Sequence, residues 1–293
     1  MITPLFTQHY PRGSAAFTEL VQQGVFNAML EDIGSGDLTA SLIPESKTAS
    51  AAIITREDAI ICGQDWVNAC FNHLDKNIKV KWLVNEGEKV VANQLLCEIT
   101  GNARAILTAE RCALNFLQLL SAVATHTRLY VLAVSGTKAK ILDTRKTLPG
   151  LRLAQKYAVT VGGGTNQRLA LYDGILIKEN HIAAAGSIHA ALQHALKLNA
   201  NVDIQIEVES MDQLKQAIEA GAVNILLDNF GISGMREAVL LNQEVYLGRA
   251  MLEASGGVNL SSARAIALTG VDRISVGSIT KNIRAIDLSL RLK

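Results

Sequence analysis

The sequence predicts an α/β protein in which an N-terminal α+β sandwich-like domain precedes a C-terminal (β/α) barrel-type domain. From about residue 140 onward, short β-branched segments alternate with amphipathic helical segments, which is typical of βα units with parallel strands. One of these strands is polar at every second position, which favours a barrel interior over a sheet covered on both faces. The 293 residues are 49% hydrophobic, enough for a large core.

Residues 1–115 are expected to form the N-terminal domain. A helix is predicted over residues 15–33, and strands are predicted over 51–54, 79–84 and 94–99. A long helix that begins at Thr108, whose hydroxyl can cap it, is expected to run towards Val134 and join the two domains. The C-terminal tail, residues 281–293, is expected to pack on this domain.

Residues 116–280 are expected to form the barrel. Its strands are predicted over 140–143, 174–178, 202–208, 224–228, 245–253 and 273–276. The third strand alternates apolar with polar residues, the polar ones being Asp203, Gln205, Glu207 and Glu209. Ser210 begins a helix that stops at Gly221, and another helix spans residues 261–269.

Charge and cysteine usage narrow the class of partner. The 28 basic and 27 acidic residues leave a net charge of +1, which provides no general attraction for nucleic acid or acidic membranes. No apolar run is long and continuous enough to predict a membrane span. The four cysteines lack C-x-x-C spacing and indicate reduced thiols in a cytoplasmic protein. A small anionic partner is expected.

Four cations gather in one stretch of the chain, near a run of three glycines at 162–164: Arg145, Lys146, Arg168 and Lys178. The first two follow a predicted barrel strand, and chemistry in barrel enzymes lies at that rim. A solvated Arg-Lys pair and a simple glycine turn are the alternatives. Lys178 is predicted to lie inside the apolar strand that contains residues 175–177, where an ammonium group needs an anionic partner.

Two acidic residues end neighbouring predicted strands, Glu207 and Asp228. Carboxylates at such positions suit Mg²⁺ or sugar hydroxyls. Neutralisation of the nearby cations explains them almost equally well.

Two small-residue triplets follow the last two predicted strands: Ser255, Gly256 and Gly257, then Ser275, Val276 and Gly277. Barrels commonly bind phosphate there through loop amides. Each triplet alone is an ordinary turn, but together they favour a site for a terminal phosphate. His189 and His194 are five residues apart and are interpreted as surface or packing residues.

The order and spacing of these motifs resemble quinolinate phosphoribosyltransferase over nearly the whole chain. The matching segments are GDLT at 36–39, AERCALN at 109–115, TRKTLPG at 144–150, GGGTNQR at 162–168, LIKENH at 176–181, EVE at 207–209, LDNF at 227–230 and ISVG at 274–277. The resemblance implies transfer of the phosphoribosyl group of PRPP to quinolinate, with loss of pyrophosphate and CO₂, giving nicotinate mononucleotide for NAD biosynthesis.

The resemblance also implies roles for individual residues. Catalysis is expected from Lys146, Lys178, Glu207 and Asp228, with Mg²⁺ on Glu207 and Asp228. The substrate-binding set adds Arg111, Thr144, Arg145, Gln167, Arg168, Ser255, Gly256, Gly257, Ser275, Val276 and Gly277. A homodimer is implied in which Arg111 reaches the partner's site, and a larger assembly is left open. The family usually has histidine where this chain has Gln167, and an amide cannot carry a proton's charge. We expect Gln167 only to orient substrate.

Two other functions remain open. The chain could be a paralogue of the same fold that uses another pyridine or small anionic acceptor. One sequence does not determine which acceptor the site selects. A non-catalytic barrel could sense phosphorylated metabolites, but a sensor would not need both acidic residues and every lysine.

Overall fold

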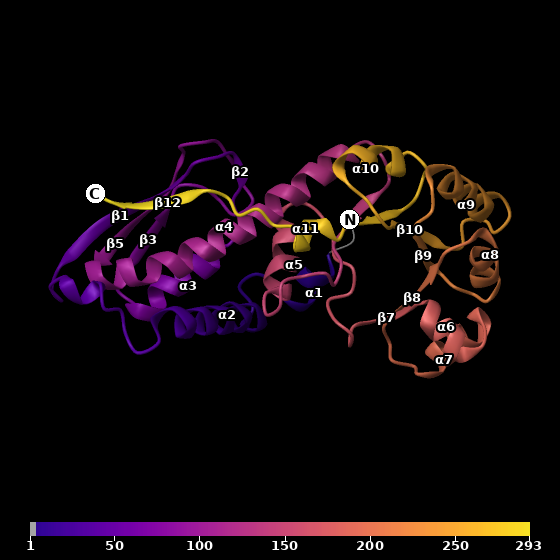
Figure 1. Cartoon of the computed structure of the whole chain (residues 1–293), viewed down its shortest axis with the longest axis horizontal. Coiled ribbons are helices and arrows are strands. Elements are labelled where there is room, and N and C mark those ends of the chain that lie inside the picture. The colour runs from indigo at the N-terminus through magenta and orange to yellow at the C-terminus, as the bar shows by residue number, and fades with distance from the viewer. Residues whose placement is uncertain (1–3) are drawn as a thin grey trace. The chain divides into compact units, whose positions relative to one another are not determined.

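The computed structural model describes residues 4–293, which form two compact units (Figure 1). The N-terminal unit comprises the chain up to Arg128 together with residues 147–163 and 279–293. The barrel unit comprises residues 129–146 and 164–278. The predicted class, a parallel-stranded C-terminal domain with a separate N-terminal α+β domain, is confirmed.

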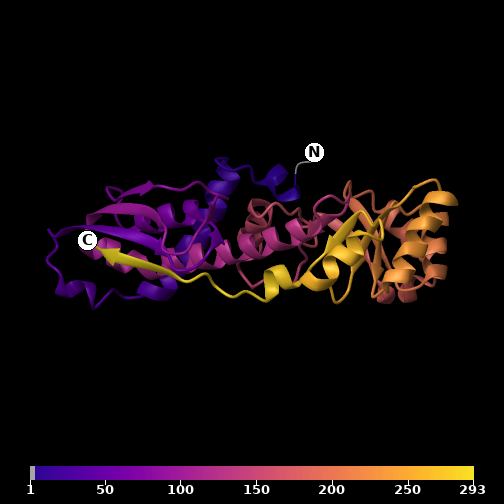
Figure 2. The same ribbon diagram turned by 90° about the horizontal axis from the view of Figure 1, so that it is seen from above.

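A four-stranded antiparallel sheet in the order β12-β1-β5-β3 organises the N-terminal unit. Its strands are β1 (Thr48–Thr55), β3 (Lys79–Trp82), β5 (Leu95–Asn102) and β12 (Leu288–Leu292). β12 lies alongside β1, with Ala51 opposite Leu292 (Figure 2). The end of the chain is therefore the edge strand of the N-terminal sheet. A separate ribbon pairs β2 (Ala59–Ile60) with β4 (Lys89–Val90).

The helices of this unit are α1 (Leu5–His9), α2 (Ala15–Ile33), α3 (Gln64–Leu74), α5 (Arg152–Val161) and most of α4 (Ala103–Ala133), with a short 3₁₀ turn at Ala40–Leu42. The predicted helix over 15–33 is confirmed, and Ser14 caps it by accepting a hydrogen bond from Phe17 N. Aromatic rings of α1, α2, α3 and α5 meet in the core: Phe6, Phe17, Trp66 and Tyr157. These contacts stabilise the unit mainly by burying apolar area.

The long helix α4 starts earlier than predicted, at Ala103 instead of Thr108. Asn102 Oδ1 accepts a hydrogen bond from Ala105 N at 3.1 Å and so caps the helix, giving a partner to one backbone N–H of its first turn. The Thr108 hydroxyl instead donates to Asp37 Oδ2 at 2.8 Å. By length and hydropathy α4 could cross a membrane, but 61% of its most apolar window is buried inside the protein, as in a core helix.

Six parallel strands build the barrel unit in the order β6-β11-β10-β9-β8-β7. They are β6 (Lys140–Leu142), β7 (Gly174–Ile177), β8 (Asp203–Val208), β9 (Asn224–Asp228), β10 (Met251–Ser255) and β11 (Arg273–Ser275). All six predicted strands exist. β10 starts later than the predicted residue 245, because Leu247 and Gly248 have positive φ values of 56° and 69° and turn the chain.

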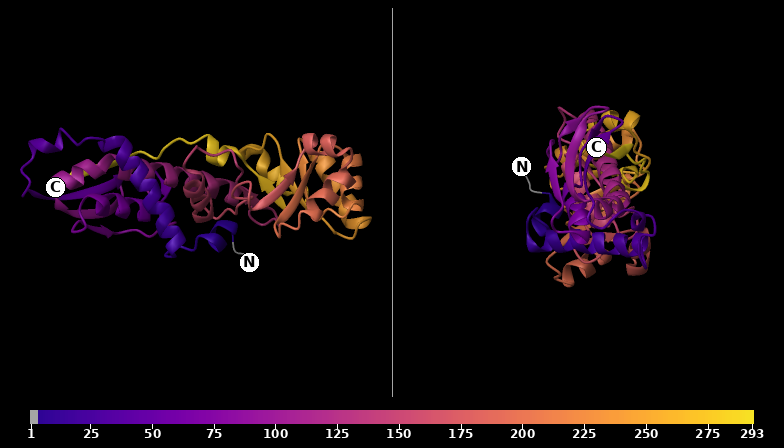
Figure 3. Two further views of the ribbon diagram at one scale, coloured as in Figure 1. Left: turned by 90° about the horizontal axis from the view of Figure 1, so that it is seen from below. Right: turned by 90° about the vertical axis from the view of Figure 1, so that its left-hand side faces the viewer.

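Helices cover one face of this sheet, as in βα units (Figures 1 and 3). They are α6 (Glu179–Ala185), α7 (Ile188–Lys197), α8 (Met211–Glu219), α9 (Ile232–Glu244) and α10 (Leu260–Ala267), with α11 (Ser278–Lys281) after β11. Ser210 caps α8 as predicted, accepting from Gln213 N. In β8, Ile206 and Val208 are fully buried, whereas Gln205 and Glu207 lie on the opposite, inner face and are also buried. The predicted polar inner face is confirmed.

Residues 164–173, the closing segment, connect the two edge strands β6 and β7. Thr165 forms a parallel bridge with Leu142, and its N–H donates to Ile141 O at 2.9 Å. At the other end, Arg168 Nη1 donates to Gly174 O at 2.9 Å, where β7 begins. The closing segment carries two predicted site residues, Gln167 and Arg168, between the strand edges.

Candidate active site

Two arginines of the barrel unit form a concentrated positive site. Arg145 follows β6, and Arg168 lies in the closing segment. Their Nε atoms are buried and make no hydrogen bond to any residue in the described range 4–293. Burial lowers the pKa of Arg168, and the positive charge of Arg145 lowers it further. Because guanidinium groups bind planar carboxylates with two parallel hydrogen bonds, this pair suits an anion with one or more carboxylates.

Lys178 forms an ion pair with Glu207, with Nζ 2.7 Å from Oε2. The Glu207 side chain is only 9% exposed and that of Lys178 is 44% exposed. The sequence predicted Lys178 to lie inside a strand, and this prediction is wrong. β7 ends at Ile177, and Lys178 is the N-cap of α6, where its backbone N–H donates to Nδ1 of His181, the third residue of that helix. The anionic partner expected for Lys178 is present, and the neutralising role considered for Glu207 is observed.

Asp228, the last residue of β9, is held by its neighbour Asn229. Asn229 Nδ2 donates to Asp228 Oδ2 at 2.9 Å, and Asn229 N donates to Ser255 O at 3.2 Å. A Cβ at Gly256 would lie 2.2 Å from Asn229 Oδ1. Only glycine therefore fits at position 256 while Asn229 keeps this conformation.

Thr144, Lys146 and Gly277 lie together at the ends of β6 and β11. Thr144 Oγ1 accepts from Lys146 N at 3.0 Å. A Cβ at Gly277 would lie 3.0 Å from Lys146 Cδ and 3.6 Å from Thr144 Oγ1. The absence of a side chain at position 277 leaves space for the lysine stem.

The two small-residue triplets differ in how much of their hydrogen-bonding capacity is already used. Val276 N donates to Leu142 O at 2.9 Å, and the buried Ser275 hydroxyl lies 3.5 Å from Ala254 O. Gly256 and Gly257 have positive φ values and precede α10, which is capped by Asn259. The 255–257 turn is therefore the better source of loop amides for phosphate.

Gln167 is fixed at its backbone and at its side chain. Its N–H donates to Asp143 Oδ1 at 3.0 Å, and its Nε2 donates to Gln205 Oε1 at 3.1 Å. Asp143 is fully buried and also accepts from Asn166 Nδ2 at 2.7 Å. Gln205 in turn donates to Glu253 Oε2 at 2.9 Å.

Five supporting polar residues of the site were not predicted from the sequence: Asp143, Asn166, Gln205, Asn229 and Glu253. Gln205 was visible as a member of the polar face of β8, and Glu253 as an acid within an apolar strand. A charged residue within an apolar strand needs a polar partner, and this property of Glu253 is the one that singled out Lys178. Asn166 and Asn229 lie within the segments GGGTNQR and LDNF that carry the family resemblance, whereas the role of Asp143 depends on its contacts with residues 166 and 167.

Arg111 lies on an exposed face of α4 in the N-terminal unit. The glycines at 162 and 163 also belong to that unit. A Cβ at Gly162 would lie 2.5 Å from Ala124 O, so close packing of α5 on α4 requires this glycine.

No three His, Cys, Asp or Glu side chains form a metal-binding group within residues 4–293. Glu207 and Asp228 provide two carboxylates from neighbouring strands. That donor set fits Mg²⁺, which usually keeps several waters and takes further oxygens from a substrate phosphate. A metal held by protein ligands alone would not fit.

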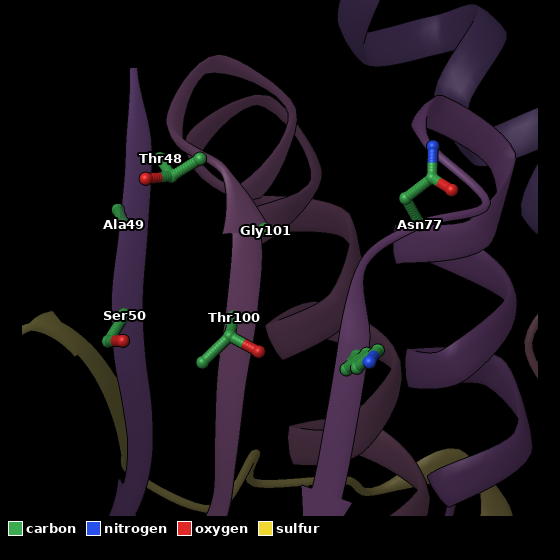
Figure 4. Close-up of a pocket in the computed structure, with 7 residues that line it drawn as sticks. Thr48, Ala49, Ser50, Asn77, Thr100 and Gly101 are labelled. Carbon is green, nitrogen blue, oxygen red and sulfur yellow. The ribbon is translucent and has the colours of Figure 1, made fainter. Parts of the chain in front are cut away.

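A shallow hollow of about 440 Å³ lies on the N-terminal sheet, lined by β1, β3 and β5 (Figure 4). Thr48, Ser50 and Thr100 line it with Lys79, and its chemistry is that of ordinary polar sheet residues. None of the predicted site residues lines it.

Comparison with known proteins assigns both parts of the chain. The profile of the quinolinate phosphoribosyl transferase N-terminal domain matches residues 37–121, and that of the C-terminal domain matches residues 123–291. A probable nicotinate-nucleotide pyrophosphorylase (carboxylating) from Bacillus subtilis is 40% identical over 89% of each chain. Its counterpart from Mycobacterium leprae is 39% identical over 90% of this chain and 94% of that protein.

Solved structures agree. The nicotinate-nucleotide pyrophosphorylase from Francisella tularensis is 49% identical, with a TM-score of 0.89 over 94% of this chain and 97% of its own. The enzyme from Ehrlichia chaffeensis is 40% identical, with a TM-score of 0.87 over 92% of this chain and 98% of its own. The predicted resemblance is confirmed, and the chain belongs to the quinolinate phosphoribosyltransferase family.

Proposed function

We propose that this protein transfers the phosphoribosyl group of PRPP to quinolinate, releasing pyrophosphate and CO₂ and forming nicotinate mononucleotide for NAD biosynthesis. The observation that carries the proposal is the Arg145 and Arg168 pair, whose buried Nε donors and mutual repulsion call for an anionic ligand. Family membership supplies the identity of that ligand.

The charges of the site fit two anionic substrates. Arg145 and Arg168 would hold quinolinate through forked hydrogen bonds to its carboxylates. Lys146 and Lys178 would act as point charges near the carboxylate and pyrophosphate groups. The turn at 255–257 and Gly277 would contribute backbone amides to the terminal phosphate of PRPP. The Thr144 hydroxyl accepts a hydrogen bond from the backbone N–H of Lys146 and so helps to position this lysine.

The acidic residues act on the ribose. As the bond between the anomeric carbon and the pyrophosphate oxygen breaks, positive charge develops on that carbon, and the carboxylates of Glu207 and Asp228 stabilise it. The quinolinate ring nitrogen forms the new bond and becomes cationic. When the adjacent carboxylate leaves as CO₂, its bonding electrons pass into the ring, and a proton then replaces CO₂ on that carbon. The protein chiefly supplies position and charge.

We also propose Mg²⁺ on Glu207 and Asp228, where it would neutralise charge on the pyrophosphate. Lys178 is expected to shift between Glu207 and substrate anions, because its side chain is 44% exposed and can leave the ion pair. We further propose a cytoplasmic location, in keeping with four cysteines that are all free and buried.

A homodimer is the proposed working unit, with Arg111 donated to the partner's site, and a larger assembly of dimers is left open. Arg111 is exposed on α4, so it is available to another subunit.

The deciding experiment incubates the purified protein with quinolinate, PRPP and Mg²⁺ and follows nicotinate mononucleotide and CO₂. Parallel reactions replace quinolinate with nicotinate or omit Mg²⁺. Product from quinolinate alone supports the proposal. Product with another acceptor only would indicate a paralogous activity, and PRPP binding without turnover would indicate a sensor.

A further inference from the structure

Glu253 is a buried acid in the interior of the barrel unit. It lies in the middle of β10, in register with Leu226 of β9 and Arg273 of β11, and is 1% exposed. Its Oε2 accepts one hydrogen bond, from Gln205 Nε2 at 2.9 Å. Its Oε1 is buried and has no hydrogen bond to any residue between 4 and 293.

Stability alone does not explain an acid at this position. Burying a carboxyl group costs free energy unless hydrogen bonds compensate for lost water. Gln205 and the Ser275 hydroxyl both favour the ionised acid by hydrogen bonding, but burial outweighs them. Because Oε1 still has no hydrogen bond within residues 4–293, the network is only partly satisfied, and such a network is less stable than an apolar core. The positive charge of Arg273 favours the ionised acid, and the negative charge of Asp143 opposes it.

The hydrogen bond from Gln205 to Glu253 continues towards the site. Because Gln205 uses its Nε2 on Glu253, its Oε1 is directed to Gln167, whose Nε2 donates to it at 3.1 Å. An amide has distinct donor and acceptor ends, so the acid at the buried end determines how each amide in the chain is turned.

Gln167 is therefore oriented from two directions. Asp143 holds its backbone N–H at 3.0 Å, and the chain from Glu253 holds its carboxamide. Gln167 adjoins Arg168, the proposed carboxylate-binding arginine. A shift of the Gln167 amide would change which polar atom the acceptor meets.

We propose that Glu253 is a positioning residue that acts through Gln205 to fix the carboxamide of Gln167 and so the orientation of the acceptor in the site. This inference rests on the proposed transferase function. Glu253 itself touches neither substrate. Burial raises the pKa of Glu253 despite hydrogen bonding from Gln205 and Ser275, and the geometry of Oε2, which accepts from Gln205 Nε2, carries the inference.

A double-mutant cycle tests the coupling. Glu253→Leu and Gln167→Ala are each expected to raise the KM for quinolinate about tenfold, with smaller changes in kcat and in the KM for PRPP, as one lost orienting hydrogen bond predicts. The double variant is expected to match the single ones, because both substitutions break the same chain. Multiplied effects, or a Glu253→Leu enzyme with parental constants, would overturn the inference.

Rescue separates positioning from folding. Glu253→Gln keeps an oxygen acceptor on a side chain of the same shape and is expected to reverse most of the rise in KM caused by Glu253→Leu. If Glu253→Leu does not fold, Gln205→Met breaks the middle of the chain and enters the same cycle with Gln167→Ala. A Glu253→Gln enzyme as impaired as Glu253→Leu, or additive effects at Gln205 and Gln167, would contradict the proposal. Absence of turnover by the parent enzyme would instead reject the transferase function.

Discussion

The Asn229 side chain occupies the space that a side chain at Gly256 would need, since a Cβ there would lie 2.2 Å from Asn229 Oδ1. Gly256 belongs to the proposed phosphate-binding turn, and Asn229 donates a hydrogen bond to the carboxylate of Asp228. The contact therefore links the turn to Asp228. Gly256 also has a φ of +93°, a conformation that other residues rarely adopt.

Gly256→Ala is expected to lower kcat/KM by at least about a hundredfold, or about 2.7 kcal/mol, because it displaces Asn229 and with it Asp228. Gly257→Ala is the matched control: it has a positive φ of 60° but no atom within 4 Å of the added Cβ. Steady-state kinetics of both variants measure the difference. Equal losses would mean that backbone strain alone, and not the contact with Asn229, sets the effect.

The two arginines are expected to select the acceptor. Arg145→Lys and Arg168→Lys keep the positive charge but lose the pair of parallel hydrogen bonds that a guanidinium group makes to a carboxylate. Each should therefore raise the KM for quinolinate by about tenfold or more, with a smaller rise in the KM for PRPP. Arg236→Lys, at an exposed position on α9, is the control. If either site variant raised only the KM for PRPP, the assignment of the pair to quinolinate would be wrong.

Gln167 is expected to support catalysis without the charge that the family's usual histidine could carry. Its backbone and amide are already held by Asp143 and Gln205, which suits a neutral orienting role. Gln167→His should therefore change kcat/KM by well under about a hundredfold. A larger gain, above about 2.7 kcal/mol, would show that a protonated group is needed at this position.

Burial raises the pKa of Glu253 above its ordinary value, which makes stability depend on pH. A raised carboxyl pKa in the folded state contributes stability that is present below the unfolded pKa and is lost as pH rises through the folded pKa. Glutamine does not ionise, so Glu253→Gln avoids this loss of stability. The free energy of unfolding of the variant should therefore increase relative to that of the parent as pH rises from 5 to 8. Each unit of raised pKa corresponds to about 1.4 kcal/mol.

Urea unfolding at several pH values measures this difference, with Glu244→Gln at an exposed position of α9 as the control. Glu86 also has a raised pKa, owing to burial, but it is present in both proteins and cancels. A constant difference between Glu253→Gln and the parent across the pH range would mean that Glu253 does not titrate differently on folding.

The strands of the barrel unit and the charged residues of the candidate site could be predicted from the sequence because their signals are local. The alternation in residues 202–209 predicted a polar inner face, and the cations at 145, 168 and 178 stood out beside turns and apolar runs. The closing segment has no such periodicity, since it makes a single bridge to β6 instead of a strand. Glu253 and Gln205 are 48 residues apart, and their pairing arises only when β8 and β10 face the same interior.

Donation of Arg111 across a dimer can be tested by co-expressing two inactive variants. In a mixed dimer of Arg111→Ala and Lys178→Ala subunits, one site regains both residues. Random pairing makes half of the dimers mixed, with one intact site in two, so about one quarter of parental activity is expected. Arg168→Ala co-expressed with Lys178→Ala is the control, because both residues belong to the same barrel unit and no mixed dimer restores a site. If the Arg111 mixture were as inactive as this control, Arg111 would serve the site of its own subunit.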